Sequence, residues 1–252
     1  MGSSDNEVDE LADCRAKLKA AEREAEENAG LARAAQEELH YFVYAASHDL
    51  QQPLRAIGTY AQLLQRDYPN DERAREFTNV IIEGAAQMNA LLRDLLTYSR
   101  TGNTADCAAV KLNAPLQWAL YNLATAVQES GAQVNGSDLP EVFADEKQMV
   151  TVFEHLIGNS IKYRSADPPK VEVWGETDGE YHTISVRDNG VGIKPEYSER
   201  IFEPFKRLHS KEIPGSGLGL AICRKIVRAH RGRIWVQSDG QQGSVFKFTV
   251  PV

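Results

Sequence analysis

Glycine and proline are nearly absent from the first hundred residues of this 252-residue chain. Only 4 of its 18 glycines and 2 of its 10 prolines lie before residue 100, and all three tryptophans lie after it. Because both residue types interrupt regular structure, the first part of the chain is predicted to form long helices. The second part mixes short apolar segments with glycine-rich turns and is predicted to be an α/β sandwich. The expected fold class is therefore α plus α/β.

Residues 1–40 carry a seven-residue repeat that predicts a coiled coil, the first of three domains. The repeat places one apolar seam along a helix, flanked by many Glu, Arg and Lys residues. A single exposed helix or a disordered acidic tail is the alternative. The two series of seam positions are Leu11, Leu18, Ala25, Ala32 and Leu39, and Cys14, Ala21, Asn28, Ala35 and Phe42.

Residues 41–102 are predicted to form an antiparallel helical hairpin, the second domain. Two amphipathic stretches flank a turn cluster at Tyr68–Asp71. One hairpin cannot cover its own apolar stripe, so two copies are expected to pair as a four-helix bundle, which makes the chain a homodimer. The stripes are Phe42, Ala45, Ala46, Leu50, Ile57, Tyr60, Leu63 and Leu64, and Phe77, Val80, Ile81, Met88, Leu91, Leu92, Leu95 and Tyr98.

The formal charge of −8 is concentrated at the N-terminus. Residues 1–40 hold 11 acidic and 5 basic side chains, which leaves residues 41–252 nearly neutral. A chain without a surplus of cations is not expected to bind nucleic acid. We find no apolar run of membrane-spanning length and no signal peptide, so we expect a cytoplasmic protein. Three cysteines without a CxxC motif predict neither a disulfide framework nor a zinc site.

Residues 103–252 are predicted to form the third domain, in which helices cover one face of a sheet. Alternating apolar residues identify the strands, and three- and four-residue spacing identifies the helices. The helices are expected over Ala114–Glu129, Glu146–Arg164 and Leu218–Arg231, and the strands over Val171–Glu176, His182–Arg187, Arg233–Ser238 and Val245–Val250.

Three elements of this domain combine residues suited to a nucleotide. Asp188–Gly192 follows a strand, where the carboxylate suits an amino group and the glycines allow close approach. Gly215–Leu220 opens a helix, whose N-terminal amides favour an anion. The first long helix carries Asn159, an oxygen ligand for Mg²⁺, with Lys162 for phosphate and Tyr163 for stacking. Each element alone also suits a simple loop or an amphipathic helix, but the three in this order predict a nucleotide site.

Over residues 40–252 the chain resembles the transmitter of a sensor histidine kinase. The resemblance implies a dimerisation and phosphoacceptor hairpin followed by a Bergerat-type ATP-binding domain. The wording of residues 205–209 and 221–227 is most similar to the output module of bacterial phytochrome-type kinases. Five ordered boxes carry the match: the H box Ala46–Leu54, the N box around Asn159, the G1 box Asp188–Gly192, the F box Phe202–Phe205 and the G2 box Gly215–Leu220.

The resemblance, rather than spacing, selects His48 among six histidines as the phosphoacceptor. Asp49 is implied to orient the imidazole ring and take up its proton, and Gln52 to orient a water. Two departures from the family pattern stand out. The family usually has Asn where this chain has His155, and its dephosphorylation motif commonly has Glu and Thr or Asn where this chain has Asp49 and Gln52.

The resemblance also assigns the ATP site. Asn159 is implied to hold Mg²⁺, Lys162 to contact the phosphates and Tyr163 to line the adenine site. Asp188 is implied to bind the adenine amino group. The remaining implied ATP-binding residues are Gly190, Gly192, Arg207, Gly215, Gly217, Leu218 and Gly219.

The function implied is an ATP- and Mg²⁺-dependent protein histidine kinase of a two-component system. It would phosphorylate His48 and pass the phosphoryl group to an aspartate of a response regulator, under an upstream sensor domain that this chain lacks. The alternative is a catalytically weak dimeric scaffold, or a phosphatase-biased transmitter, that binds nucleotide and receiver domains. His155 is the feature that favours the alternative.

Overall fold

The computed structural model describes residues 28, 30, 40, 43–102, 106–208 and 215–252. The chain divides into two compact units, Met1–Asp49 and Leu50–Val252. The predicted coiled coil over residues 1–40 lies almost entirely outside the described residues and stays a prediction, as do the three domain boundaries. No helix within the described ranges is long and apolar enough to cross a membrane.

Two helices form the predicted hairpin. Residues 43–67 are helical, and α2 (Glu72–Arg100) follows after a short turn. Asp71 caps α2, because its side chain accepts hydrogen bonds from two backbone N–H groups of the first turn, each at 3.0 Å. Between the helices, Gln65 Nε2 donates to Asn79 Oδ1 at 2.7 Å. The helix–turn–helix arrangement predicted from the sequence is confirmed.

The rest of the described chain forms two sheets and their covering helices. In chain order the elements are β1 (Ala108–Lys111), α3 (Asn113–Asn122), α4 (Ala124–Ser130), β2 (Gln133–Gly136), β3 (Glu141–Ala144), α5 (Glu146–Lys162), β4 (Lys170–Thr177), β5 (Tyr181–Asp188), α6 (Gly219–Ala229), β6 (Ile234–Gln237) and β7 (Ser244–Pro251), with 3₁₀ turns at Pro195–Tyr197 and Arg200–Phe202. The larger sheet has the order β2-β4-β5-β7-β6, and only β2 and β4 are parallel. β1 and β3 pair antiparallel as the second sheet.

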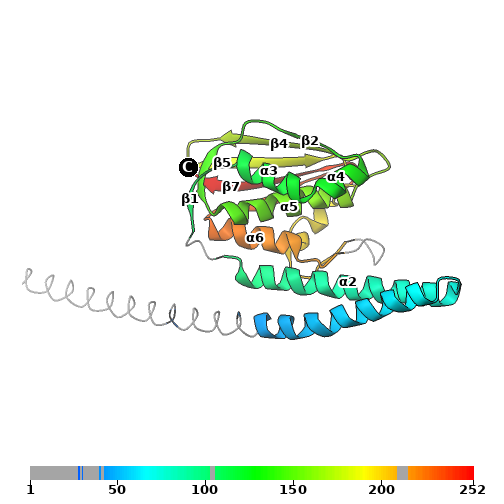
Figure 1. Cartoon of the computed structure of the whole chain (residues 1–252). Coiled ribbons are helices and arrows are strands. Elements are labelled where there is room, and N and C mark those ends of the chain that lie inside the picture. The colour runs from blue at the N-terminus through cyan, green and yellow to red at the C-terminus, as the bar shows by residue number, and fades with distance from the viewer. Residues whose placement is uncertain (1–27, 29, 31–39, 41–42, 103–105, 209–214) are drawn as a thin grey trace, which may run out of the picture. The chain divides into compact units, whose positions relative to one another are not determined.

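Helices cover one face of the five-stranded sheet, as predicted. α5 and α6 pack against that face, and α3 packs against α5 (Figure 1). Alternate side chains of β7 are buried, which is the pattern of a strand with one covered face. At the centre of the core, Phe153 of α5 meets Phe248 of β7 edge-on, with ring centroids 6.0 Å apart. Both side chains are fully buried.

The structure differs from the prediction between β1 and α5. The helix expected over Ala114–Glu129 is two helices, α3 and α4, which break at Leu123. The short strands β1, β2 and β3 were not predicted. Each has four residues, which is too few to show a clear alternation, and β2 pairs with a strand that lies far along the chain. The four predicted strands and the two later helices are confirmed, with ends shifted by one or two residues.

The buried side chain of His230 fastens the turn between α6 and β6. Its Nε2 accepts a hydrogen bond from the backbone N–H of Asp145 at 3.0 Å, so its proton lies on Nδ1. Nδ1–H then donates to the carbonyl of Ile226 at 2.8 Å. These two bonds hold the end of α6 against the start of α5 and give this histidine a structural role.

Candidate functional site

The C-terminal end of α5 brings three predicted nucleotide residues together. The helix begins after Asp145, whose side chain accepts the backbone N–H of Gln148 at 3.1 Å. It ends at Tyr163, whose N–H donates to the carbonyl of Asn159 at 2.8 Å. Because the apolar side of α5 is buried against the sheet, its last turn is held in a fixed position. Asn159, Lys162 and Tyr163 consequently line the same cavity.

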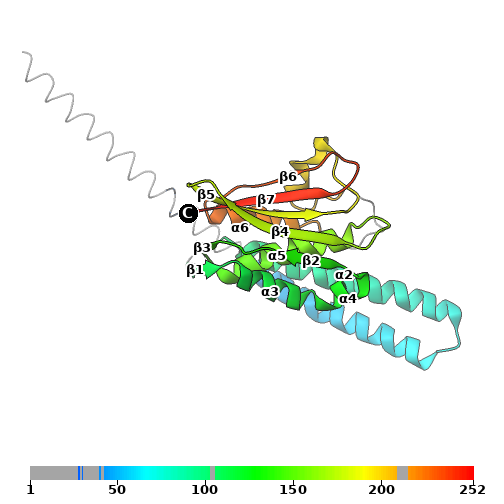
Figure 2. The ribbon, with the colours of Figure 1, turned by 90° about the horizontal axis from the view of Figure 1, so that it is seen from above.

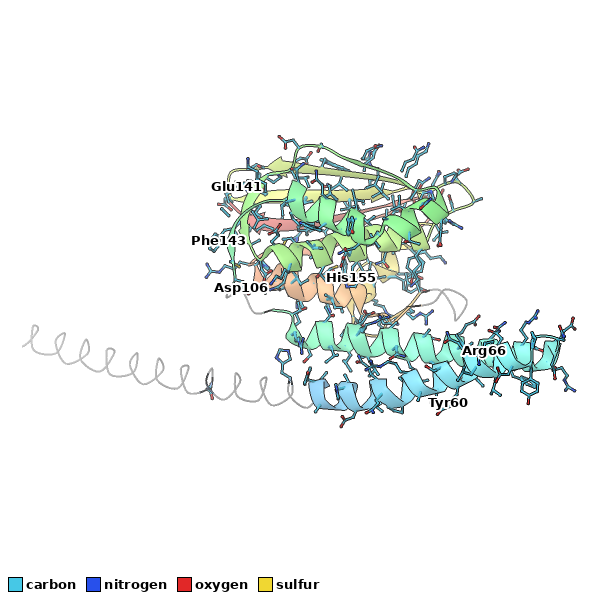
Figure 3. All side chains as sticks on the ribbon, in the orientation of Figure 1. Tyr60, Arg66, Asp106, Glu141, Phe143 and His155 are labelled. Atoms are coloured by element: carbon cyan, nitrogen blue, oxygen red, sulfur yellow. The ribbon has the colours of Figure 1, made fainter. Side chains whose placement is uncertain are left out.

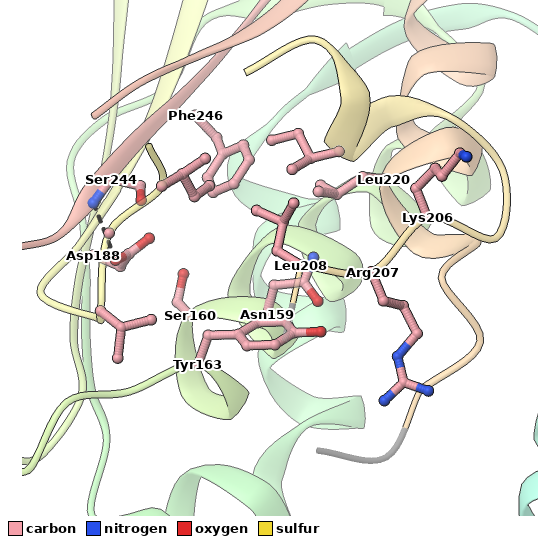
Figure 4. Close-up of a pocket in the computed structure, with 14 residues that line it drawn as sticks. Asn159, Ser160, Tyr163, Asp188, Lys206, Arg207, Leu208, Leu220, Ser244 and Phe246 are labelled. Atoms are coloured by element: carbon pink, nitrogen blue, oxygen red, sulfur yellow. Dashed lines mark hydrogen bonds between the residues drawn. The ribbon is translucent and has the colours of Figure 1, made fainter. Parts of the chain in front are cut away.

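A first cavity of about 630 Å³ lies between the end of α5, the end of β5 and the segment that follows it (Figure 4). Apolar side chains, among them Ile193 and Phe246, form much of its wall, and Asp188 lies at one end. An apolar cavity with a few placed polar groups is the common form of a small-molecule site. Its lining residues are Asn159, Ser160, Tyr163, Asp188, Val191, Gly192, Ile193, Ile201, Lys206, Arg207, Leu208, Leu220, Ser244 and Phe246.

The carboxyl group of Asp188 is held by one oxygen. Its Oδ1 accepts hydrogen bonds from the backbone N–H groups of Gly190 at 2.9 Å and Ser244 at 3.2 Å. Its Oδ2 has no donor within the described part of the chain. Burial raises the pKa of this carboxyl, and the two N–H groups offset part of that rise. The second oxygen is therefore positioned to accept a hydrogen bond from an amino group in the cavity.

Glycine is required at two positions around the site. A Cβ on Gly190 would lie 2.5 Å from the carbonyl oxygen of Tyr163, which accepts the N–H of Val191 at 3.1 Å. Gly217 has a φ of +74°, and a Cβ there would lie 2.9 Å from the carbonyl carbon of Phe205. The N–H of Phe205 donates to the carbonyl of Gly217 at 3.0 Å. These close backbone approaches fix the loop after β5 and the segment before α6.

A second cavity of about 570 Å³ shares lining residues with the first and is polar. Three cations line it, Lys162, Lys206 and Arg207, together with the carboxylate of Asp94 from α2. Burial lowers the pKa of Lys162, Arg207 lowers it further, and Asp94 raises it. The Lys162 Nζ also lies 5.0 Å from the centre of the Tyr163 ring. A cationic cavity next to an apolar one matches the two ends of a nucleotide, phosphates and base.

His155 (labelled in Figure 3) lies one turn before Asn159 in the wall of the second cavity. Burial lowers the pKa of its imidazole, while Asp94 and Glu154 act in the opposite direction. A Cβ on Gly219 would lie 3.0 Å from its Nδ1, so the ring packs on the first turn of α6. Mg²⁺ prefers oxygen ligands and takes few from the protein when phosphates supply the rest. The amide oxygen of Asn159 fits that requirement, and the imidazole does not.

The predicted ATP-binding residues fall into three groups. Asn159, Lys162, Tyr163, Asp188, Gly192, Arg207, Gly215, Gly217 and Gly219 line one or both cavities. Gly190 supports the loop from outside the lining. Leu218 is fully buried in the core and lines neither cavity. Its place before α6 is set instead by its N–H, which donates to the Ser216 hydroxyl at 3.0 Å.

Sequence reasoning missed several lining residues. Lys206 lines both cavities, and only its position next to Arg207 in the sequence could have indicated it. Ser244 and Phe246 come from the last strand, which carries no box. Asp94 belongs to α2, and nothing in its own segment distinguishes it from a solvated helical acid.

In the other unit, His48 and Asp49 lie next to each other on the helix over residues 43–67. The Nδ1 of His48 is 3.3 Å from Oδ1 of Asp49, and the two side chains are 65% and 83% exposed. An Nδ1–H that donates to this carboxylate leaves the lone pair of Nε2 free in solvent. Gln52 belongs to the unit Leu50–Val252, where it is exposed.

Comparison with known proteins gives two domain matches. Residues 38–104 match the His Kinase A (phospho-acceptor) domain. Residues 144–252 match the family described as histidine kinase-, DNA gyrase B-, and HSP90-like ATPase. The first match covers the hairpin with His48, and the second covers α5 and every lining residue of the two cavities except Asp94.

Individual relatives agree with these matches. The chain is 40% identical to the phytochrome-like protein Cph1 of Synechocystis over 91% of its length and 43% identical to cyanobacterial phytochrome A of Nostoc over 85%. It spans only 32% and 29% of those two proteins. The crystal structure of full-length ShkA in complex with AMPPNP has a TM-score of 0.64 and 27% identity, covering 83% of this chain and 45% of that one. The hairpin and the α/β part together thus match the transmitter module of a sensor histidine kinase.

Proposed function

We propose that this chain is the catalytic part of a two-component system, which phosphorylates itself on His48 and passes the phosphoryl group to an aspartate of a response regulator. The observation that carries the proposal is the polarity of the two adjoining cavities. Asp188 faces the apolar one, and Lys162, Lys206 and Arg207 line the other. ATP has the matching polarity, with an amino-bearing base at one end and anionic phosphates at the other.

Six of the lining residues then have a role in binding. Asp188 accepts a hydrogen bond from the adenine amino group through Oδ2, and Tyr163 lines the base. The three cations attract the phosphates and offset the negative charge that develops during phosphoryl transfer. Asn159 would hold Mg²⁺ through its amide oxygen, and the ion would supply further charge neutralisation. These groups position the phosphates, which is most of what this reaction requires of a protein.

The exposed imidazole of His48 is the nucleophile in this proposal. Asp49 holds the proton on Nδ1, so the lone pair of Nε2 attacks the terminal phosphorus of ATP. The new bond is Nε2–P, the bond to the bridging oxygen breaks, and ADP leaves. Asp49 then takes the proton from Nδ1 and restores a neutral ring. Exposure of 65% suits a group that must meet both ATP and a receiver domain.

The hairpin supports a dimeric and receiver-binding role. Large apolar side chains of both helices are exposed within the described chain, and burying them is the expected reason for pairing with a second copy. They are Leu50, Ile57, Tyr60, Leu64, Phe77, Val80, Ile81 and Met88. A sensor domain outside this chain belongs to the same proposal, because the matched relatives extend well beyond this chain. A cytoplasmic location is proposed with it.

The test is phosphorylation by ATP labelled at the γ-phosphate, in the presence of Mg²⁺. The wild-type chain should gain a label that is stable in alkali and lost in acid, as expected of a phosphohistidine. His48→Gln should abolish this label, whereas His182→Gln should retain it, because His182 lies on β5 outside both cavities. Labelling that persists in His48→Gln would sink the proposal.

One observation favours the weaker scaffold as a second candidate function. His155 occupies the wall of the phosphate-side cavity with a neutral ring that is a poor ligand for Mg²⁺. A scaffold would bind a fluorescent ATP analogue and a receiver domain but form no phosphohistidine. His155→Asn should then restore labelling. If the wild-type chain already gains the phosphohistidine label efficiently and His155→Asn does not change the amount, the scaffold is excluded. Release of phosphate from a labelled receiver domain would indicate the phosphatase-biased form.

A further inference from the structure

A basic groove runs along the free edge of the five-stranded sheet, away from both nucleotide cavities. We call it the β6 groove; it has a volume of about 940 Å³, and none of its residues lines either cavity. Arg224 and Arg228 of α6 form one side, and Arg233, Trp235 and Val236 at the sheet edge form the other. Figure 2 shows α6 and β6, the two elements that supply most of the lining residues.

The charge of the groove contrasts with that of the chain. The protein carries a net charge of −8, yet residues 213–238 contain five Lys and Arg residues and no acid. Among the described residues that line the groove, only Glu199 is acidic. Within the same described ranges, Arg224, Arg228 and Arg233 form no ion pair with a carboxylate. Three guanidinium groups therefore face one carboxylate in an open groove.

The backbone of β6 offers free hydrogen-bonding groups to the groove. Among the residues that the structure describes, β6 is the last strand of its sheet and pairs with β7 alone. The N–H of Thr249 donates to the carbonyl of Arg233 at 2.9 Å, which fixes the phase of the antiparallel ladder. Since alternate residues of such a strand point their N–H and C=O groups to opposite sides, those of Ile234 and Val236 point away from β7. An extended chain added at this edge would find them unpaired.

The arginines and the aromatic ring are already in place. The guanidinium carbon of Arg233 lies 4.5 Å from the centre of the Trp235 ring, which holds the cation over an apolar plane. Arg231 adopts a φ of +58° in the turn, and the N–H of Gly232 donates to the carbonyl of Val227 at 2.9 Å. With the bonds of His230, these features fix α6 against β6. Little ordering of the groove is therefore needed when a ligand binds.

We propose that the β6 groove binds an acidic, extended peptide segment of a partner protein, which adds to the sheet as a strand beside β6. Its carboxylates would pair with Arg224, Arg228 and Arg233, and an apolar side chain would pack on Trp235. Backbone pairing supplies affinity and the charges supply selectivity. The free strand edge favours a peptide over a nucleic acid or an anionic membrane, because neither of these offers the alternating N–H and C=O groups that continue a sheet.

The test measures binding of a fluorescein-labelled peptide of alternating Glu and Val to the full chain by anisotropy. The acidic peptide should bind, its affinity should fall as salt is added, and a Lys–Val peptide of the same length should not bind. An acidic peptide with proline at alternate positions should bind about tenfold more weakly, because proline lacks the N–H that pairs with the edge.

Three variants separate charge from strand addition. Arg228→Glu combined with Arg233→Glu should weaken binding at least about tenfold. Val236→Pro should weaken it by about the same factor, since it removes an edge N–H and leaves the ladder with β7 intact. Lys111→Glu is the matched control, because it changes the charge of an exposed residue on β1 and should leave binding unchanged. Circular dichroism of each variant verifies that it is folded.

Three results would overturn the proposal. The first is that the folded wild-type chain does not bind the acidic peptide. The arginines would then serve to prevent pairing of the sheet edge with other strands. The second is equal binding by wild type and the double arginine variant. The third is that phosphatidylserine vesicles or single-stranded DNA compete with the peptide and bind Val236→Pro as well as they bind the wild type. This result would identify a general anion surface.

Discussion

The helical hairpin exposes large apolar side chains, whereas the α/β part of the chain buries such side chains in a core. In the hairpin, Phe77 and Val80 of α2 are 59% and 65% exposed, and mainly small residues such as Ala61 and Ala85 are buried. In the α/β part, Phe153 and large aliphatic residues from α3, α5, α6 and most strands form one core. The chain thus completes one hydrophobic core by itself and leaves the other open.

This difference shows where a partner is needed. The α/β part has buried its apolar surface and needs only its ligand, so its chemistry lies inside, at Asp188 and Lys162. The hairpin holds His48, the proposed phosphoacceptor, on the surface and exposes apolar residues that a partner could cover. Under the proposed function, a single chain would therefore suffice to bind nucleotide, while the hairpin would need another molecule to cover its apolar residues.

The largest effect is expected from a pair of identical substitutions in the two regions. Phe153→Ala should lower the free energy of unfolding of the α/β part by about 3–5 kcal/mol, because it leaves a cavity in a closed core. Phe77→Ala should change it by less than about 0.5 kcal/mol. All three tryptophans lie in the α/β part, so denaturant unfolding followed by tryptophan fluorescence reports this region selectively.

The dependence on protein concentration should distinguish the same two substitutions further. The loss in Phe153→Ala should not depend on concentration, whereas any loss in Phe77→Ala should appear as weaker self-association in sedimentation. Equal losses of fluorescence-detected stability in the two variants would contradict the contrast between a closed and an open core.

The sequence predicts the regular parts of both regions and fails where distant segments meet. The stripe of α2 and the alternation of β7 are visible because each element repeats its own period over many residues. β2 has four residues and exists because it pairs with β4, which its own sequence does not show. Asp94 joins the site only through the contact of α2 with α6 and the end of α5, so no motif marks it.

The second prediction concerns the buried chemistry of the α/β part. Asp188→Asn should weaken ATP binding by about 1.5–3 kcal/mol, roughly 10- to 150-fold. The reason is that the amide NH₂ would replace Oδ2 and face the adenine amino group, donor against donor. Titration calorimetry with ATP and with ITP, whose base has a carbonyl in place of the adenine amino group, measures the effect, since the loss should be specific to the amino-bearing base. An unchanged ATP affinity would remove Asp188 from the adenine site.

Two glycines should respond to alanine with opposite signs. Gly217→Ala should destabilise the segment before α6 by about 1–3 kcal/mol, because its φ of +74° and the nearby Phe205 backbone exclude a Cβ. Gly84→Ala in α2 should stabilise its helix by about 0.5–1 kcal/mol, since a Cβ there meets nothing within 4 Å. Hydrogen exchange of the two segments gives the comparison. Protection that rises in both variants would contradict the strain at Gly217.

The smallest effects should come from two aspartates with opposite pKa shifts. Burial raises the pKa of Asp188 in the folded chain, so the folded state binds a proton more tightly than the unfolded state. Stability from this group is therefore complete below the unfolded pKa of about 3.9 and is lost as pH rises through the folded pKa. Asp188→Asn should consequently unfold at a higher denaturant concentration than wild type at neutral pH, and the gain should vanish in acid.

Asp178 is the matched control on an exposed turn. The backbone N–H groups of Tyr181 and Glu180 donate to its carboxylate and lower its pKa. Its stabilisation is present above the unfolded pKa and is lost as pH falls through the folded value. Asp178→Asn should therefore be less stable than wild type at neutral pH, and the two should converge in acid. If both substitutions changed the stability at neutral pH with the same sign, burial would not destabilise the Asp188 carboxylate in the folded chain. The unliganded site would then not present an incompletely paired carboxylate to a ligand.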